Sequence, residues 1–438
     1  MCYIFVALIK RITFNQVKPR KPKTIMKQFF LLTFSLSYLL TSAQTPEITS
    51  WILNTTGETG YNNIASNVQS VYYTTTDVYV SATCIPGYDI GPWQGNPNTP
   101  ANQNFVFKIT RNPQENAGTR TATALGHIGV WSNGVSIFNA KDAFSYNNQG
   151  IWNQDALPNE GISFDDCLGH PAPNGEYHHH VNPTCLYDDQ NSSAHSPIIG
   201  YAFDGFPIYG AYGYANSDGS GGIVRMETGY RLRSVTDRTT LADGTVLSAG
   251  QYGPAINTTY PLGKYIEDYE YVQGLGHLDE YNGRVCVTPE YPSGTYAYFV
   301  TVDEDLIPVF PYTVGKYYYG TVPSGNTGPN SGHNTIPGGA TEYINTTGIG
   351  EDAGSGQWAA GSYPNPTQGI INLHFAYGFS GQQLTLNVMD AKGAVLIQQQ
   401  ISAIDQVIDL SALAQGMYFI NIADQNANSF TQKIFKNR

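Results

Sequence analysis

Hydrophobic and polar residues alternate in short runs along most of this chain, and Gly, Pro or Asn follows each run. Between residues 51 and 319 the clearest runs are 71–76, 77–83, 105–110 and 294–301. Alternation places every second side chain on one face of a strand, whereas the punctuating residues are typical of turns. No window shows a sustained helical period. The pattern predicts an all-β or β-rich main domain, sandwich-like and with long loops.

Two segments of different character follow that domain. Residues 321–362 include ten Gly, and Ser, Thr, Asn and Pro make up much of the remainder. This composition is typical of a flexible linker. Residues 363–438 return to apolar alternation, at 370–375, 384–389 and 417–422. These short strands, separated by turns, predict a second and smaller β-sandwich.

The segment that starts at Met26 has the pattern of a secretory signal peptide. A basic Lys27 precedes an apolar run over residues 29–40, and the small residues Thr41 and Ala43 follow it. The apolar run is too short for a permanent membrane span. Residues 1–25 precede a complete signal and carry six Lys or Arg. We therefore expect Met26 to be the true start, residues 1–43 to be absent from the exported protein, and the main domain to occupy residues 44–320.

Charge and composition narrow the class of protein. The 438 residues include 22 Lys+Arg and 34 Asp+Glu, and 41% are hydrophobic, which is sufficient for a buried core. Without residues 1–43 the balance is 15 basic against 34 acidic residues, a net charge near −19. A protein that binds the phosphate backbone of a nucleic acid needs clustered Lys and Arg. The sequence therefore argues against a nucleic-acid partner.

Four cysteines remain after the leader and its Cys2 are removed. They are Cys84, Cys167, Cys185 and Cys286. An exported chain allows disulfides, and four cysteines allow three pairings. We expect Cys167–Cys185, whose short loop is worth about 3 kcal/mol in the chain-entropy model, and then Cys84–Cys286 as the remaining pair. The alternative is four buried free thiols.

Histidines cluster in one part of the main domain. Five of the nine fall within residues 170–195. Residues 175–181 predict a strand after a Pro-Asn-Gly turn, so His178 and His180 share one face while Tyr177 and His179 share the other. Two imidazoles at this spacing can reach one divalent ion. A third ligand is then expected to be one of three nearby residues, namely Asp165, Asp166 or His170.

Other potential ligands are scattered along the chain. His127 and His277 each follow a Gly, which lets the backbone approach closely, and Asp204 lies on a predicted turn. A lone His such as His127 is more often a hydrogen-bonded structural residue than a metal ligand. We expect no role for His195 in a loop, nor for the histidines at 333 and 374. No HExxH, GxSxG, P-loop or dinucleotide-binding motif is present, so serine-hydrolase and nucleotide chemistry lack sequence support.

Four ordered segments of the main domain, spread over residues 70–320, resemble the YHYH protein family. They are residues 126–140, 166–180, 195–210 and 278–299. The family is named for a Tyr-His-Tyr-His tetrad. This chain has Tyr177-His178-His179-His180, so His179 replaces the second Tyr. That position should point away from its two His neighbours, and the predicted ligand face is preserved.

Two further residues lie at positions that match this family. Arg284 follows Asn-Gly in a predicted turn, and Glu290 follows Thr-Pro. If they lie near the histidines, Arg284 would contact an anion and Glu290 would act as a general base. A structural ion pair is an equally weighted alternative.

The C-terminal segment resembles a second family. Residues 363–367, 409–418 and 433–436 are similar to motifs of the C-terminal sorting domain of type IX (Por) secretion cargo. The resemblance spans residues 363–438. It implies that type IX secretion machinery is a partner and that the protein is secreted or attached to the outer cell surface.

The sequence supports two hypotheses of different classes. In the first, the main domain binds zinc or copper through His178, His180 and one or two of His170, His127, His277 and Asp204. Such a centre suits a metal-dependent hydrolase or oxidoreductase, or simple metal binding. In the second, the domain is a scaffold or binds carbohydrate or another extracellular polymer through stacking tyrosines. Those tyrosines surround Phe206 and are Tyr201, Tyr209, Tyr212 and Tyr214. Tyr is equally a good strand former.

Overall fold

A computed structural model describes residues 44–328, 331–344, 359–363, 367, 369–377, 384–390, 392–401, 405–423 and 429–436. The chain divides into two units, residues 1–43 and 44–438. The expected signal peptide and the proposed start at Met26 lie outside the described residues. Within the described residues, no helix has the length and apolar character needed to cross a membrane.

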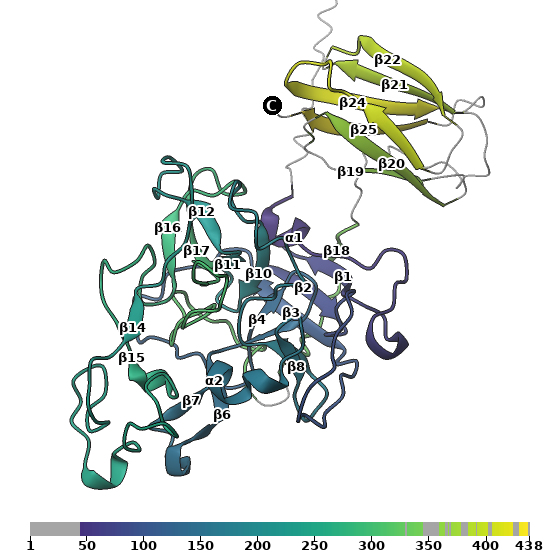
Figure 1. Cartoon of the computed structure of the whole chain (residues 1–438). Helices are drawn as coiled ribbons and strands as arrows, with labels where there is room; N and C mark the ends of the chain where they lie inside the picture. Colours follow the sequence, from purple (N-terminus) through teal and green to yellow (C-terminus); the bar gives the residue numbers. More distant parts are fainter. Residues whose placement is uncertain are drawn as a thin grey trace, which may run out of the picture. The chain divides into compact units, whose positions relative to one another are not determined.

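A four-stranded antiparallel sheet forms one layer of the main domain (Figure 1). Its strands, in spatial order, are β18 (Thr341–Glu342), β1 (Val68–Tyr73), β2 (Asp77–Ala82) and β3 (Phe105–Thr110). Burial alternates strictly along β3, because Phe105, Phe107 and Ile109 face the core. The strands predicted from alternation at 77–83 and 105–110 are confirmed, whereas the run predicted at 71–76 forms a strand only to Tyr73, because β1 begins earlier, at Val68.

A mixed eight-stranded sheet forms the other layer. Its order is β16 (Gly283–Cys286), β17 (Thr295–Phe299), β11 (Pro207–Tyr209), β10 (Ile198–Ala202), β4 (His127–Trp131), β5 (Ser136–Phe138), β9 (Tyr177–His179) and β8 (Gly169–Pro171). The pairs β11–β17 and β5–β9 are parallel. Phe107 of the first sheet shares one core with Val130 and Tyr201 of this sheet. The predicted sandwich-like β-rich domain is confirmed.

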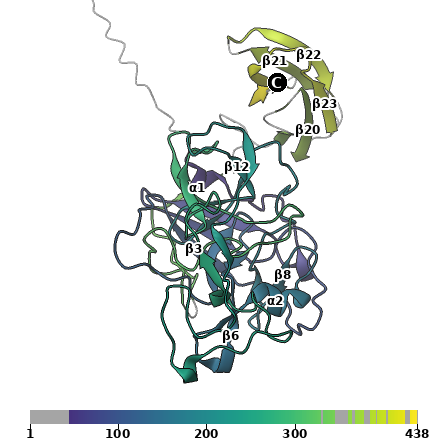
Figure 2. The same ribbon diagram turned by 60° about the vertical axis from the view of Figure 1, so that its left-hand side comes forward.

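Short elements surround the two sheets. Paired strands are β6 (Lys141–Ser145) with β7 (Asn153–Asp155), β12 (Tyr212–Tyr214) with β13 (Ile223–Arg225), and β14 (Tyr230–Leu232) with β15 (Tyr269–Tyr271). The helices are α1 (Pro46–Thr49), α2 (Ala156–Glu160) and the 3-10 turns η1 (Tyr61–Asn63), η2 (Tyr146–Asn148), η3 (Gly161–Ser163), η4 (Ala249–Gln251) and η5 (Ile266–Asp268). Figure 2 shows α2 beside β8, at the edge of the larger sheet.

Ordered contacts of the main domain continue past residue 320, into the segment predicted as a linker. The Asn326 side chain accepts a hydrogen bond from the Lys108 backbone N–H at 3.0 Å, and His333 forms a β-bridge with Val106. β18 extends the first sheet beside β1. Gly and Asn in this segment therefore serve close packing against β3 as well as turns.

The C-terminal segment forms two small sheets. One has the order β19 (Ala359–Tyr363), β20 (Ile370–Tyr377) and β23 (Asp405–Asp409). The other has the order β22 (Val395–Ile401), β21 (Leu384–Asp390), β24 (Gly416–Ala423) and β25 (Ser429–Lys436). Ile371, Leu386 and Ile420 belong to one buried cluster that joins the two sheets. The predicted small β-sandwich is confirmed.

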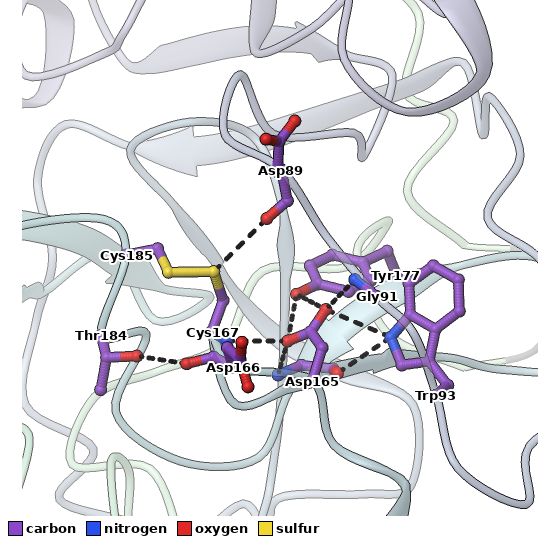
Figure 3. The surroundings of a disulfide bond; sticks show 10 residues. Asp89, Gly91, Trp93, Asp165, Asp166, Cys167, Tyr177, Thr184 and Cys185 are labelled. Carbon is purple, nitrogen blue, oxygen red and sulfur yellow. Dashed lines mark hydrogen bonds between the residues drawn. A yellow bond between two sulfur atoms is a disulfide. The ribbon is translucent and has the colours of Figure 1, made fainter.

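One of the two expected disulfides is present. Cys167 and Cys185 are bonded (Figure 3), but Cys84 and Cys286 are buried free thiols, so the Cys84–Cys286 prediction is wrong. The sheet order explains the error. Cys84 contacts Ser136 of β5 at 3.4 Å, while Cys286 lies on β16, five strands away. Five strand spacings amount to about 24 Å, whereas a disulfide requires Cα atoms within about 7 Å.

Candidate metal centre

The β8–β9 hairpin brings three histidines together at the edge of the larger sheet. His170 on β8 pairs directly with His178 on β9. His180 follows two residues after His178, so strand alternation places it on the same face. The predicted strand and its shared histidine face are confirmed. Of the three candidates for a third ligand, the fold selects His170.

Asp165 instead organises the loop that leads into β8. Its Oδ1 accepts hydrogen bonds from the backbone N–H groups of Cys167 and Gly169, each at 3.0 Å. The Tyr177 hydroxyl donates to the same carboxylate at 2.9 Å, as does Trp93 Nε1 at 3.2 Å (Figure 3). Together these bonds hold the Asp165 side chain in place. The first tyrosine of the tetrad therefore fixes the hairpin on the face opposite the histidines.

The three imidazoles form a compact buried group. His170, His178 and His180 are each at most 5% exposed, and one nitrogen from each lies within 4.8 Å of the other two. His178 Nε2 lies 3.2 Å from His180 Nε2. Two nitrogens bound to one tetrahedral zinc ion at 2.0–2.1 Å lie about 3.3 Å apart. The spacing is therefore that of two ligands on a common ion.

The opposite ring nitrogens are all held by fixed acceptors. His178 Nδ1 lies 3.0 Å from the Glu176 carbonyl oxygen, and His180 Nδ1 lies 2.6 Å from the Asn139 carbonyl oxygen. His170 Nδ1 lies 2.8 Å from Ser163 Oγ, whose own proton is donated to the Glu160 carbonyl. Each Nδ1 therefore carries a proton. In the neutral rings, each Nε2 is then an unprotonated acceptor.

Burial lowers the pKa of two of the three rings, those of His170 and His178. Burial, followed by the charge of His180, lowers the pKa of His170 to about 4, although the charge of Glu160 acts in the opposite direction. Burial and the nearby His170 and His180 also lower the pKa of His178 well below its usual value. The Phe138 ring stacks on His178 with centroids 3.8 Å apart. His178 Nε2 and His180 Nε2 face each other at 3.2 Å while both Nδ1 atoms are already engaged, so either a shared proton or a metal cation between them would satisfy both nitrogens.

A carboxylate that the sequence reasoning missed completes the group. Glu160 Oε2 lies 3.3 Å from His180 Nε2 and 3.6 Å from His170 Nε2. Burial opposes ionisation of Glu160, but the hydrogen bond and charge of His180 outweigh it and lower its pKa. Asp142 lies next to it, and burial and the charge of Glu160 raise the pKa of Asp142 to about 6. Only the tertiary position of α2 could reveal Glu160, because no sequence spacing links it to the histidines.

Asp155 positions the helix that carries Glu160. As the N-cap of α2, it accepts a hydrogen bond from the Leu157 backbone N–H. The Tyr312 hydroxyl donates to it at 2.8 Å. Burial raises the pKa of Asp155 to about 7, even though the Tyr312 hydrogen bond acts in the opposite direction. The helix is thus anchored by a buried carboxyl group.

This raised pKa predicts a pH dependence of stability. The folded state binds the Asp155 proton more tightly than the unfolded chain, so this contribution is complete below about pH 4 and is lost as pH rises through about 7. The free energy of unfolding, measured in urea, should fall by a few kcal/mol between pH 5 and pH 8 in the wild-type protein because of Asp155. Asp155→Asn should lack this part of the fall. Asp218→Asn, at an exposed turn, is the control. A slope equal to that of wild type would refute this assignment.

The histidine group lies in the wall of a pocket of about 550 Å³. His170, His178 and His180 line it together with Glu160 and Asp142. Ligand-binding pockets are usually about 300–1,000 Å³ in volume. The three histidines therefore border a cavity of small-molecule size.

His127 does not join the group. Its Nδ1 pairs with Glu176 Oε1 at 2.8 Å, and its Nε2 lies 2.8 Å from Ser331 Oγ. The Ser331 hydroxyl donates to the Asn326 carbonyl at 2.9 Å, so its single proton is already used. The arrangement links Asn326 and Ser331 to β4 and is not a charge-relay system with a free nucleophile. The alternative reading of His127 as a structural residue applies.

His277 and Asp204 also lie elsewhere. His277 is in a partly exposed loop, where its Nδ1 accepts from the Glu227 backbone N–H at 3.1 Å. Asp204 is fully buried beyond β10 and accepts from the Tyr298 hydroxyl at 2.6 Å and the Gly320 backbone N–H at 2.8 Å. Burial raises its pKa to about 6. Both positions are structural, so neither residue supplies a ligand to the histidine group.

Arg284 and Glu290 are far from the histidines and do not pair with them. Arg284 lies on β16, at the opposite edge of the sheet from β8, and donates to the carbonyls of Tyr214 and Ala215. Glu290 accepts a hydrogen bond from the Tyr209 hydroxyl at 2.9 Å. Burial raises the pKa of Glu290. The expectation that they supply an anion contact and a general base to the histidines is wrong.

The tyrosines suggested as stacking platforms are mostly inside the protein. Tyr201 and Tyr209 are fully buried, and Phe206 is buried beside them in the same core. The strand-former interpretation therefore applies to Tyr201 and Tyr209, whereas Tyr212 and Tyr214 on β12 are half-buried. His179 is also fully buried, with its ring next to Trp131 and Tyr177. It points away from His178 as predicted, but into the core and not outward.

Comparisons with known proteins agree with both resemblances. A strand-rich domain with a buried histidine cluster, together with a small C-terminal sandwich, defines a β-rich protein. Residues 106–311 match the family model described as YHYH protein, and residues 362–437 match the model described as a secretion system C-terminal sorting domain. The chain therefore combines a YHYH domain with a type IX secretion sorting domain. The sorting domain marks the chain for export to the cell surface or beyond.

Solved structures add little to this assignment. A DUF3244 family protein with an immunoglobulin-like β-sandwich fold from Bacteroides vulgatus is 18% identical over 19% of this chain and 93% of its own, with a TM-score of 0.17. PorZ of Porphyromonas gingivalis, a surface component of the type IX secretion system, is 11% identical over 84% of this chain, with a TM-score of 0.15. This chain spans 59% of PorZ. No curated protein matches the chain.

Proposed function

We propose that the YHYH domain holds one divalent transition metal ion, zinc or copper, on the Nε2 atoms of His170, His178 and His180. The observation that carries this proposal is the pair of Nε2 atoms of His178 and His180, which face each other at 3.2 Å while both Nδ1 atoms are engaged by backbone carbonyls. Neutral imidazole suits either metal. Fixed Nδ1 partners are also what metal-binding histidines usually have.

Glu160 favours a hydrolytic role for this centre. Zinc bound by three histidines lowers the pKa of a bound water to about 7. Glu160 Oε2 is 3.3 Å from His180 Nε2. The carboxylate could therefore accept a proton from a water molecule held beside the three histidines. Asp142 next to Glu160 can take part in passing the proton on. The pocket admits a substrate to the same side.

Export fits this role. The sorting domain supports delivery by the type IX system, and we infer that the mature chain begins after residue 43 and loses its sorting domain on the outer surface. The chain is then either released or attached there. Cys167–Cys185 is a bond that persists in such an oxidising setting.

Metal analysis of the exported full-length chain tests the proposal. We expect about one equivalent of zinc or copper per chain. Removal with dipicolinate should lower the melting temperature by about 5 °C, and returning the metal should restore it, because an ion at 100 times its Kd adds about 2.7 kcal/mol. A metal-free protein that no divalent transition metal stabilises would contradict the proposal. It would leave a protonated His180 paired with Glu160 instead.

A further inference from the structure

The mouth of the histidine pocket exposes three large apolar side chains. Leu125, Phe144 and Ile162 line the pocket, yet they are 52%, 61% and 72% exposed. They come from three separate segments of the chain. Single exposed apolar residues are common on proteins, but a group gathered at one pocket is typical of a binding site. The rim is therefore apolar, whereas the floor carries imidazoles and carboxyl groups.

The same short elements position the rim and the floor. Phe144 lies two residues after Asp142 on β6, and its backbone N–H donates to Asp142 Oδ1 at 3.1 Å. Ile162 lies two residues after Glu160, in η3, which also supplies the Ser163 hydroxyl that holds His170 Nδ1. The backbone of each of these two rim residues is therefore tied to that of a floor residue. Rim and floor therefore form one site.

The polar part of the pocket indicates the charge of the ligand's head group. A divalent ion adds two positive charges to three neutral imidazoles, and Lys141 also lines the pocket. Glu160 and Asp142 offset part of that charge. A head group with a single negative charge balances the remainder. Between floor and rim, Phe138 lies against His178 and continues the apolar wall.

We propose that the pocket binds a small amphipathic molecule, with an anionic metal-binding head at the histidines and an aryl or branched alkyl arm against Phe144 and Ile162. This inference rests on the proposed function, because the ion anchors the head group. The pocket volume suits a small molecule or the end of a chain. The arm buries apolar surface that the free protein leaves in water.

Hydroxamates of different arms test the inference. With the full-length chain carrying one equivalent of Zn²⁺, calorimetry should show benzohydroxamate binding at least about tenfold more tightly than acetohydroxamate, because only the former buries a phenyl ring. In Phe144→Ser/Ile162→Ser the ratio should fall toward one, while zinc content and acetohydroxamate affinity stay unchanged. Val246→Ser, at an exposed apolar residue away from the pocket, is the matched control.

The outcomes separate this inference from the metal site. Equal affinity for the two hydroxamates in a zinc-loaded wild type would overturn the amphipathic ligand and leave the metal centre standing. If neither hydroxamate bound a zinc-loaded chain, the amphipathic ligand would also be overturned and the metal centre would stand, since the ion would then have no accessible coordination position. A chain that holds no metal would overturn both proposals together.

Discussion

Replacing His178 with alanine is expected to abolish stabilisation of this protein by metal. Each ligand supplies roughly a third of the binding energy of a three-histidine site, so the loss should exceed a hundredfold in affinity, or about 3 kcal/mol. His178→Ala/His180→Ala should bind no metal. Both rings are buried and face one ion position. Calorimetric titration of the metal-free proteins with Zn²⁺ and Cu²⁺ measures the effect.

Two control variants make this result specific. His277→Ala removes a partly exposed histidine that is not part of the cluster and should retain wild-type affinity. His179→Tyr restores the family tetrad on the opposite face of the same strand and should retain the metal even if the packing around Trp131 changes. If His179→Tyr lost metal as completely as His178→Ala, the effect would come from the strand as a whole and not from its ligand face.

Local pattern predicted much of this structure, because local pattern determines strand faces. The pairing of His178 with His180 on one face follows from the two-residue period of a strand. The Cys167–Cys185 bond follows from a short loop. His170 was one of three options, and the choice among them depends on strand register: it pairs with His178, whereas Asp165 is used to hold the turn.

The errors concern residues whose positions depend on long-range topology. Arg284 and Glu290 follow turns that resemble functional motifs, but β16 lies at the far edge of the sheet from β8. Glu160 has no motif, and it reaches His180 because Asp155 caps α2 beside the hairpin. The position of a functional side chain could therefore be predicted where it depends only on residues close by in the sequence. It was not predictable where strand order decides which segments meet.

Removing the Cys167–Cys185 bond is expected to weaken both the fold and the metal site. The bonded residues are 18 apart in sequence, and His170, His178 and His180 all lie between them. Closing a loop of this length is worth about 3 kcal/mol in the chain-entropy model. Cys167→Ser/Cys185→Ser should therefore lower the unfolding free energy by about that amount in urea.

The same variant should lose metal affinity, because ion binding must then order a hairpin that the disulfide normally restrains. We expect a decrease of about tenfold, which corresponds to about 1.4 kcal/mol. Cys286→Ser, which removes a free thiol on β16, is the matched control and should leave metal affinity unchanged. If the disulfide variant lost stability but kept full metal affinity, the Asp165 turn alone would be sufficient to hold the three imidazoles in place. In that case the bond would stabilise the fold without preorganising the site.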